Sequence, residues 1–190
     1  MKPLELRENV VEHGRRRRAD VVRVTRCART QDSPVAQRDP RSRFDGDVLG
    51  LYADVPFERT ATMRAMLAGL NDSDAPAAVV LGFEAPDTLS YGRIIASGDR
   101  IAWMVEHKDA SEDQRKVGLC NSGLLAARAE ELFDLLARVG NDNAQGEFYL
   151  PDIVNIAIGD GRTCAVVTTG DPDEVAGINS RAELAEAEGR

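Results

Sequence analysis

Short hydrophobic runs separated by polar clusters predict a series of strands in this chain. Runs rich in branched and aliphatic residues predict buried strands; they lie at residues 20–24, 47–52, 77–83 and 163–169. Further strands are expected after the clusters YGR and CNSG. Residues 100–108 alternate as a half-buried strand does, with Ile101, Trp103 and Val105 on one face and Ala102, Met104 and Glu106 on the other.

Apolar residues recur with helical spacing in several other segments. In residues 59–70, Thr60 is the expected N-cap, and one face is predicted to carry Met63, Met66, Leu67 and Leu70. Similar spacing predicts helices at residues 129–139 and 149–158, and Ser180 is expected to cap a last helix over residues 180–190. Because strands and helices alternate, we expect an α/β domain with a mostly parallel sheet.

Composition limits the possible classes of protein. With 190 residues, of which 43% are hydrophobic, the chain can form one domain with a sizeable core. No apolar run approaches the ~18 residues needed to cross a bilayer, and the N-terminus has no secretory signal, so we expect a cytoplasmic protein without a membrane partner. The cysteines Cys27, Cys120 and Cys164 are far apart, which favours reduced thiols over a disulfide framework or a metal site.

Charge divides the chain near residue 45. Residues 1–45 carry a net charge of +5 and residues 46–190 a net charge of −13, which together give −8. This acidity argues against nonspecific binding of nucleic acid. The basic N-terminal part could act as a nucleic-acid arm, but residues 1–43 contain no aromatic side chain on which a base could stack. We therefore expect no nucleic-acid partner.

Two polar clusters beside predicted strands have both a functional and a plain structural interpretation. Asp54 ends a buried strand, where open α/β sheets bind ligands, and its carboxylate suits Mg²⁺ held against a phosphate. The same residue could simply form the turn before Val55 and Pro56. Gly92 would let a ligand approach the backbone closely, or it could be a turn glycine.

Three further residues are open to two interpretations as well. Glu106 at a strand end could accept hydrogen bonds from sugar hydroxyls, or it could be a solvated charge. Asn121 suits an amide-bearing sugar, but also a β-bulge. Asn179 precedes the last helix, where it could bind a ligand or cap the helix. The order and spacing of these residues, rather than any one of them, point to a family.

The segments LYADVPF, YGRII, MVEHKDAS, CNSGLLA, NDNAQGEFYLPDIV and DPDEVAGINSRAEL, in this order, resemble the N-terminal pyrophosphorylase domain of the GlmU family. Members are bifunctional N-acetylglucosamine-1-phosphate uridylyltransferases and glucosamine-1-phosphate acetyltransferases. The resemblance covers about residues 44–190 and implies an incomplete Rossmann-like nucleotidyltransferase domain of the nucleotide-diphospho-sugar transferase type. It implies that UTP and N-acetylglucosamine 1-phosphate give UDP-N-acetylglucosamine and pyrophosphate, for peptidoglycan and lipopolysaccharide precursors.

The resemblance also implies roles for individual residues. Asp54 and Asn179 match the metal-side positions and would hold Mg²⁺ as the catalytic pair. Tyr52 and Ala53 match the segment that contacts the nucleotide sugar, with Ala53 where family members commonly have glycine. The family's sugar-binding positions fall on Gly92, Glu106 and Asn121. The loop NDNAQGEFY is expected to close over the sugar side.

Residues 1–43 depart from the family's pattern. Family members open with a glycine-rich loop that holds the triphosphate, followed by a uracil-reading stretch, whereas these residues contain a single glycine, Gly14, and many arginines. We expect residues 1–43 to be an atypical Arg-rich segment, disordered or frame-disrupted, and residues 44–190 to be the C-terminal part of the domain. Uridylyl transfer should then be impaired. The alternative is a non-catalytic remnant that binds sugar phosphate or an intact homologue. Because no hexapeptide repeat follows, no left-handed β-helix acetyltransferase domain is expected.

Overall fold

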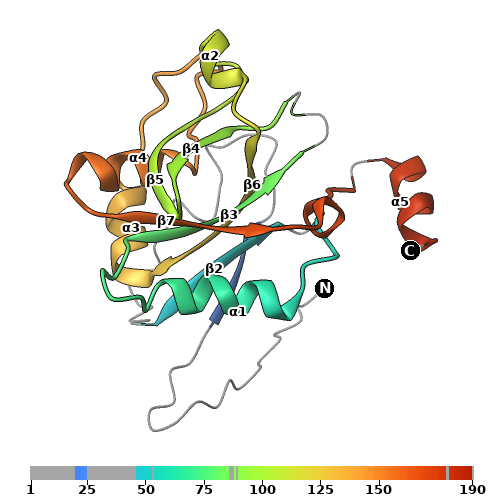
Figure 1. The fold of residues 1–190 in the computed structure, drawn as a ribbon, viewed down its shortest axis with the longest axis horizontal. Coiled ribbons are helices and arrows are strands. Elements are labelled where there is room, and N and C mark those ends of the chain that lie inside the picture. The colour runs from blue at the N-terminus through green and yellow to red at the C-terminus, as the bar shows by residue number, and fades with distance from the viewer. Residues whose placement is uncertain are drawn as a thin grey trace, which may run out of the picture.

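The computed structural model describes residues 20–24, 46–52, 54–85, 88, 90–178 and 180–189. Within them, seven strands form one sheet in the order β1-β2-β6-β3-β7-β5-β4 (Figure 1). Their bounds are β1 (Asp20–Val24), β2 (Asp47–Tyr52), β3 (Ala78–Glu84), β4 (Arg93–Ser97), β5 (Arg100–Val105), β6 (Leu119–Arg128) and β7 (Cys164–Thr169). Most of residues 1–43 lies outside the described part, so the prediction for that segment stays untested apart from the expected strand β1.

The sheet contains both parallel and antiparallel pairs of strands. β1 is parallel to β2, and β3 is parallel to β7. β6 runs antiparallel to both β2 and β3, and β5 runs antiparallel to both β7 and β4. Most of the described strands therefore point the same way, but the reversed strands β5 and β6 make most of the pairings antiparallel, so the sheet is mixed rather than mostly parallel.

A second pairing of β6 brings distant strand ends together. Besides pairing with β2 and β3, β6 contacts β4 through the pair Arg93 and Cys120. Pairing can thus be followed from β6 through β3, β7, β5 and β4 back to β6. Because of this circuit, the start of β4, the end of β5 and the start of β6 lie at one place in the fold.

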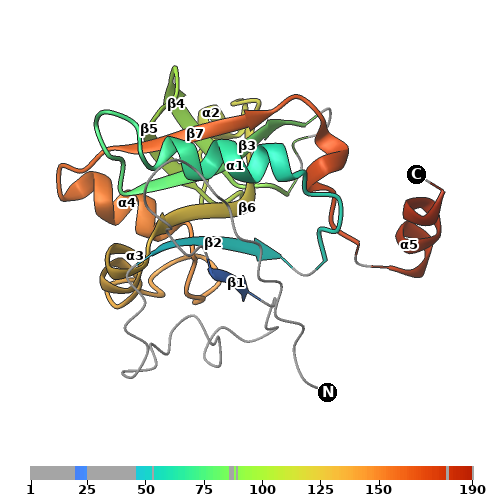
Figure 2. The same ribbon diagram turned by 90° about the horizontal axis from the view of Figure 1, so that it is seen from below.

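Helices cover both faces of the sheet, and each face has its own hydrophobic core (Figures 1 and 2). On one face, α1 (Thr60–Gly69) packs against β3 and β7. On the other, α3 (Ala129–Leu136) and α4 (Asp152–Gly159) pack against β6 and β5. Successive residues of β3 alternate between the two cores, as a strand buried on both sides requires: Val79 and Leu81 face α1, and Ala78 and Val80 face α3 and α4.

The start of α1 differs from the prediction. Thr60 is the first helical residue rather than the cap, and Arg59 occupies the N-cap position without a side-chain capping bond. Instead, the backbone N–H of Arg59 donates to a carboxylate oxygen of Glu174, 2.9 Å away. One backbone donor at the helix start is therefore satisfied from a distant part of the chain.

The faces of β5 also differ from the prediction. Ile101 and Met104 are buried, whereas Trp103 is 46% exposed. The pairs with β4 run from Ile101 opposite Ala96 to Trp103 opposite Ile95, so Ala102 is an extra residue on β5. Such a β-bulge shifts the inward side by one residue, and strict alternation cannot reveal it.

The remaining elements are short and lie near the ends of the strands. They are α2 (Glu112–Arg115), the 3₁₀ helix η3 (Pro172–Val175) and α5 (Arg181–Glu188). Ser180 caps α5 as predicted, because its hydroxyl accepts from the Glu183 N–H at 3.2 Å. α5 stands apart from the other elements (Figures 1 and 2). In the part of the chain that the structure describes, every helix is too short or too polar to cross a membrane.

Candidate active site

Three of the predicted site residues, Gly92, Glu106 and Asn121, meet at the circuit of strands and are called the strand-end cluster below. A Cβ atom at Gly92 would lie 3.2 Å from Oε1 of Glu106, so the carboxylate lies directly against this glycine. The carbonyl oxygen of Gly92 accepts a hydrogen bond of 2.9 Å from the backbone N–H of Asn121. The structure therefore brings these residues together, although Gly92 precedes β4, Glu106 follows β5 and Asn121 lies near the start of β6.

Glu106 is a half-buried carboxylate in an acidic environment. Burial raises its pKa above the ordinary value for glutamate, and the nearby carboxylates of Asp152 and Asp109 raise it further. The pKa of Asp152 is also raised, first by burial and then by Asp109. The partial burial of Glu106 argues against the simple alternative of a fully solvated edge charge. A ligand that donates hydrogen bonds here would relieve this repulsion.

The loop of residues 141–149 contacts the segment that follows β5. The Lys108 ammonium group donates to the side-chain oxygen of Gln145, and the N–H of Ala144 donates to Asp109 at 2.9 Å. Tyr149 ends this loop, and burial raises the pKa of its hydroxyl; the nearby Gln145 side chain opposes the rise, while Asp109 and Glu106 add to it. The loop thus borders the strand-end cluster.

Asn121 takes part in a β-bulge, which was one of its two predicted roles. The register between β3 and β6 shifts between Val80 and Gly82, opposite this part of β6. Asn121, which is 8% exposed, accepts a 2.9 Å hydrogen bond on its side-chain oxygen from the Gly123 N–H. This bond orients the amide, so a bulge and a ligand-binding role are compatible here.

Tyr52 lies against the same bulge. Gly123 has a φ of +87°, and a Cβ atom there would lie 2.9 Å from Cζ and 3.0 Å from Oη of Tyr52, and nearer still to Cε2. Only glycine leaves room for the tyrosine ring at this point. The predicted nucleotide-sugar residue Tyr52 is in this way placed next to the strand-end cluster.

Asp54 lies in a half-buried turn after β2, beside the segment that follows η3. The N–H of Ile178 donates to the backbone oxygen of Asp54 at 2.7 Å, and the Val55 N–H donates to Tyr52 at 3.3 Å. Asn179 and Ala53 lie outside the described residues. The pairing of Asp54 with Asn179 stays a prediction, although Ile178, the residue before Asn179, is bonded to Asp54.

The residues on the Asp54 side fit a hard divalent cation that also binds phosphate. A carboxylate and an amide oxygen are hard ligands, and Mg²⁺ commonly takes one or two protein ligands beside substrate phosphates. Among the described residues, no group of three or more His, Cys, Asp or Glu side chains could hold a metal ion by itself. Asp54 and Asn179 as the ligands of such a cation stay a prediction.

The sequence patterns missed three residues near the site. Gly123 was part of a recognised cluster, but its positive φ was not visible from the pattern. Tyr149 lay in a recognised loop without an assigned role. Glu174 lay in a recognised segment without an assigned role, because the hydrogen bond that it accepts from Arg59 spans 115 positions.

Sequence comparison relates the chain to one family. The bifunctional protein GlmU of Novosphingobium aromaticivorans is 71% identical over 149 residues, which are 78% of this chain and 33% of that protein. GlmU of Sphingopyxis alaskensis is 69% identical over 147 residues, covering 77% of this chain and 32% of that protein. GlmU of Azorhizobium caulinodans is 44% identical over 184 residues, covering 96% of this chain and 40% of that protein. The chain thus spans roughly a third of the length of these relatives. No family model matches it.

Solved structures agree with this relationship at the level of the fold. A UDP-glucose pyrophosphorylase complexed with UDP-glucose has a TM-score of 0.53 at 15% identity, covering 76% of this chain and 57% of that one. CMP:2-keto-3-deoxy-manno-octonic acid synthetase complexed with CTP has a TM-score of 0.53 at 14% identity, covering 75% of this chain and 60% of that one. The fold is that of the nucleotidyltransferases, as the resemblance implied. The chain belongs to the GlmU family, of which it represents part of the pyrophosphorylase domain.

Proposed function

We propose that this chain carries the sugar-phosphate side of a UDP-N-acetylglucosamine pyrophosphorylase site, with impaired uridylyl transfer. The reaction would join UTP and N-acetylglucosamine 1-phosphate to UDP-N-acetylglucosamine, a precursor of the cell wall, and release pyrophosphate. The setting would be the cytoplasm. The observation that carries the proposal is the strand-end cluster, in which Gly92, Glu106 and Asn121 are joined by direct contacts.

The cluster offers the chemistry that an acetamido sugar requires. The ionised carboxylate of Glu106 can accept hydrogen bonds from ring hydroxyls, and Gly92 leaves room for the sugar beside the backbone. Asn121 uses its side-chain oxygen to accept from Gly123, and its NH₂ group is the donor it could offer to the acetamido carbonyl. The partly buried position of Glu106 would strengthen such bonds relative to water.

Transfer itself requires positioning and charge neutralisation more than covalent catalysis. The phosphate of N-acetylglucosamine 1-phosphate would attack the α-phosphorus of UTP in line, forming one P–O bond while the bond to pyrophosphate breaks. Asp54 and Asn179 would hold Mg²⁺, which when bound supplies positive charge beside the phosphates. The bond from Ile178 to the backbone of Asp54 supports a shared location for the two ligand-bearing segments.

Impairment is proposed because residues 1–43 offer no glycine-rich loop. In the family that loop presents backbone N–H groups, an Arg and a Lys to the triphosphate. Here the triphosphate would approach residues 46–190, whose net charge is −13, without those donors. Loss of one preorganised donor commonly slows a reaction by ~10²–10³-fold, and several are missing together.

Pyrophosphate release tests this proposal directly. The 190-residue chain and an intact GlmU would be compared with UTP, Mg²⁺ and N-acetylglucosamine 1-phosphate at equal protein concentration. We expect turnover at least ~10²-fold below the intact enzyme, measurable only if background phosphatases are removed. Turnover within about tenfold of the intact enzyme would show that residues 1–43 replace the loop, and the impairment would be refuted.

A second function, binding without catalysis, is favoured by the contrast between the cluster and residues 1–43. The chain would then bind N-acetylglucosamine 1-phosphate and release no pyrophosphate. Titration calorimetry with this sugar phosphate, with glucose 1-phosphate as the control ligand, separates the alternatives. Absence of binding to either ligand would refute both functions.

A further inference from the structure

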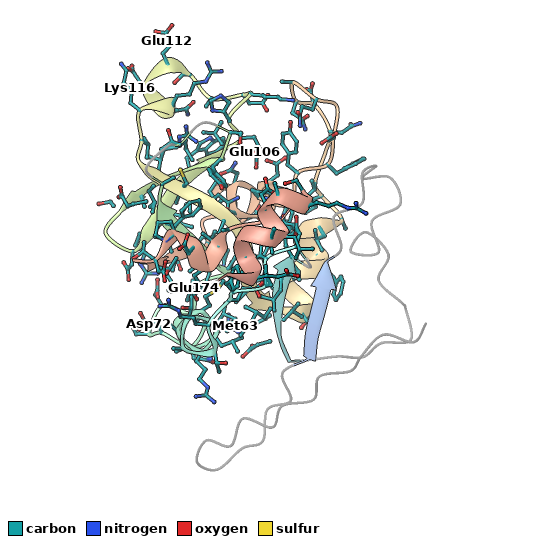
Figure 3. All side chains as sticks on the ribbon, turned by 90° about the vertical axis from the view of Figure 1, so that its right-hand side faces the viewer. Met63, Asp72, Glu106, Glu112, Lys116 and Glu174 are labelled. Atoms are coloured by element: carbon teal, nitrogen blue, oxygen red, sulfur yellow. The ribbon has the colours of Figure 1, made fainter. Side chains whose placement is uncertain are left out.

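Glu174 is a buried carboxylate that lies outside the strand-end cluster. Only 2% of its surface is exposed. One carboxylate oxygen accepts the Arg59 N–H at 2.9 Å, and the other accepts the hydroxyl of Thr169 at 2.7 Å. Figure 3 shows Glu174 well apart from Glu106. Its role is therefore separate from that of the strand-end cluster.

The contacts of Glu174 join the loop after β2 to the segment after β7. Thr169 and Glu174 belong to the end of β7 and to η3, whereas Arg59 and Thr62 belong to the start of α1. Burial acts to raise the pKa of Glu174, but hydrogen bonds from Thr62, Thr169 and the Arg59 backbone outweigh it and lower the pKa. On the exposed side, the Arg59 side chain also forms an ion pair with Asp171, which is called the outer arm of the clamp. These five residues are called the loop clamp.

The two joined segments run side by side in opposite directions. At one end, Arg59 meets Glu174. At the other end, Asp54 accepts the N–H of Ile178 at 2.7 Å. Val55 and Val175 are both buried within these segments. The Asp54 segment is thus linked to the Ile178 segment twice. One link is the direct bond between Asp54 and Ile178, and the other is the loop clamp, a few residues away along both segments.

We propose that Glu174 is a positioning residue that fixes the spacing between Asp54 and the segment leading to Asn179, and thereby sets the affinity for a divalent cation. This inference rests on the proposed function, because it uses the predicted cation ligands Asp54 and Asn179. Glu174 itself touches neither cation nor substrate. Residues that orient metal ligands in this way typically contribute 10–100-fold to metal affinity.

The test compares cation binding with local opening of the clamp. Mn²⁺ binding to the whole chain would be followed by electron paramagnetic resonance, and exchange of the Ile178 and Arg59 amides by NMR. For Glu174→Ala we expect about tenfold weaker Mn²⁺ binding and about tenfold faster exchange at Ile178. Should Glu174→Ala fail to fold, Thr169→Val removes one donor to the carboxylate with little change of volume and should give a smaller change in the same direction.

Two control variants separate positioning from loss of charge or of global stability. Asp134→Asn removes a negative charge from the exposed face of α3. Leu135→Ala opens the core beneath α3 and α4 and lowers the melting temperature without touching the clamp. Both controls should bind Mn²⁺ as the original chain does, at temperatures where they are folded.

Each outcome decides a different point. Weaker binding and faster Ile178 exchange in the clamp variants alone support the inference. Unchanged Mn²⁺ affinity in Glu174→Ala, or unchanged exchange at Ile178, overturns it and leaves the proposed function standing. If the original chain binds no Mn²⁺ while Ile178 exchange still responds to Glu174→Ala, the proposed cation site fails and the clamp is structural only.

Discussion

The strand-end cluster and the loop clamp hold neighbouring parts of the proposed site in different ways. In the strand-end cluster, position follows from backbone pairing: Gly92 bonds to Asn121 between strands, and Glu106 lies against Gly92. In the loop clamp, position follows from side chains, because the buried carboxylate of Glu174 joins two loops. The strand-end cluster should therefore be sensitive to a side chain added at a closely packed glycine, and the loop clamp to the loss of one side chain.

The two regions also differ in which side chains are available to a ligand. In the strand-end cluster the Glu106 carboxylate and the Asn121 NH₂ group are left to interact with a ligand, since strand pairing already fixes the backbone. In the loop clamp, the Glu174 carboxylate bonds to the Thr169 side chain and to the backbone of the other loop, and so holds the loops together. Asp54, outside the clamp, is the described residue to which cation binding is assigned in the proposal. Substitutions of side chains in the strand-end cluster should alter ligand binding. Substitutions in the loop clamp should make the two joined loops less ordered.

The largest effect is expected for Gly123→Ala, which tests the backbone-built region. The new Cβ would collide with the Tyr52 ring at a φ of +87°, so the free energy of unfolding should fall by about 2–5 kcal/mol. Gly98→Ala is the matched control, because Gly98 has a φ of +63° but open space around it; it should cost only about 1–2 kcal/mol. Urea unfolding measures both, and equal losses would mean that Tyr52 does not lie against Gly123.

A smaller effect is expected for Glu106→Ala, which removes ligand chemistry and leaves the strands in place. Binding of N-acetylglucosamine 1-phosphate should weaken by about 1–3 kcal/mol, the usual result of deleting a buried hydrogen-bonding partner. Glu112→Ala on α2 is the control, since Figure 3 shows Glu112 far from Glu106. Titration calorimetry that gives the same affinity for both variants would exclude Glu106 as a ligand.

The acidity around Glu106 predicts a dependence of stability on pH. Burial and the carboxylates of Asp152 and Asp109 raise the pKa of Glu106 in the folded state. The folded chain then binds more protons than the unfolded chain, so stability falls as the pH rises from the ordinary glutamate pKa through the raised one. Glu106→Gln should therefore raise the melting temperature by a few degrees at pH 7.5, and this gain should vanish near pH 4.

Thermal unfolding followed by circular dichroism checks this pH effect. The exposed Glu112→Gln variant should show no such difference between the two pH values. A melting temperature of Glu106→Gln that equals that of the original chain at pH 7.5 would mean that the carboxylate is better solvated than its burial indicates.

Much of the fold follows from short-range patterns in the sequence. The strand of residues 47–52 was predicted with its observed bounds, because its apolar residues Val48 and Leu49 are buried in the cores on the two faces of the sheet. Ser180 was recognised as a cap from its residue type before a helical pattern, and the structure adds that Glu183, three positions later, completes a local pair of hydrogen bonds. The bulge at Ala102 was missed, since a single extra residue leaves the alternating pattern of the sequence unchanged.

The candidate site was predictable where motifs carry it and not where distant residues meet. The strand-end cluster was identified from motifs, but its direct contacts depend on the pairing of β4 with β6, which strand patterns do not specify. The helix start at Thr60 was misjudged because its capping carboxylate, Glu174, comes from beyond β7. Asn179 and Ala53 lie outside the described residues, so their roles stay predictions.

The smallest effect is expected for Asp171→Asn, which removes the outer arm of the loop clamp. The side chains of Arg59 and Asp171 are 61% and 37% exposed, so their ion pair should contribute less than about 1 kcal/mol and should weaken further in high salt. The asparagine can still accept the Asp173 N–H, which Asp171 accepts at 3.1 Å, so η3 keeps its cap. Urea unfolding at low and high salt should therefore show a small loss that disappears with salt, beside a larger and salt-independent loss in Glu174→Ala. If Asp171→Asn were as damaging as Glu174→Ala, the exposed ion pair would hold the loops together, and the contrast drawn between a buried carboxylate and its exposed neighbour would be wrong.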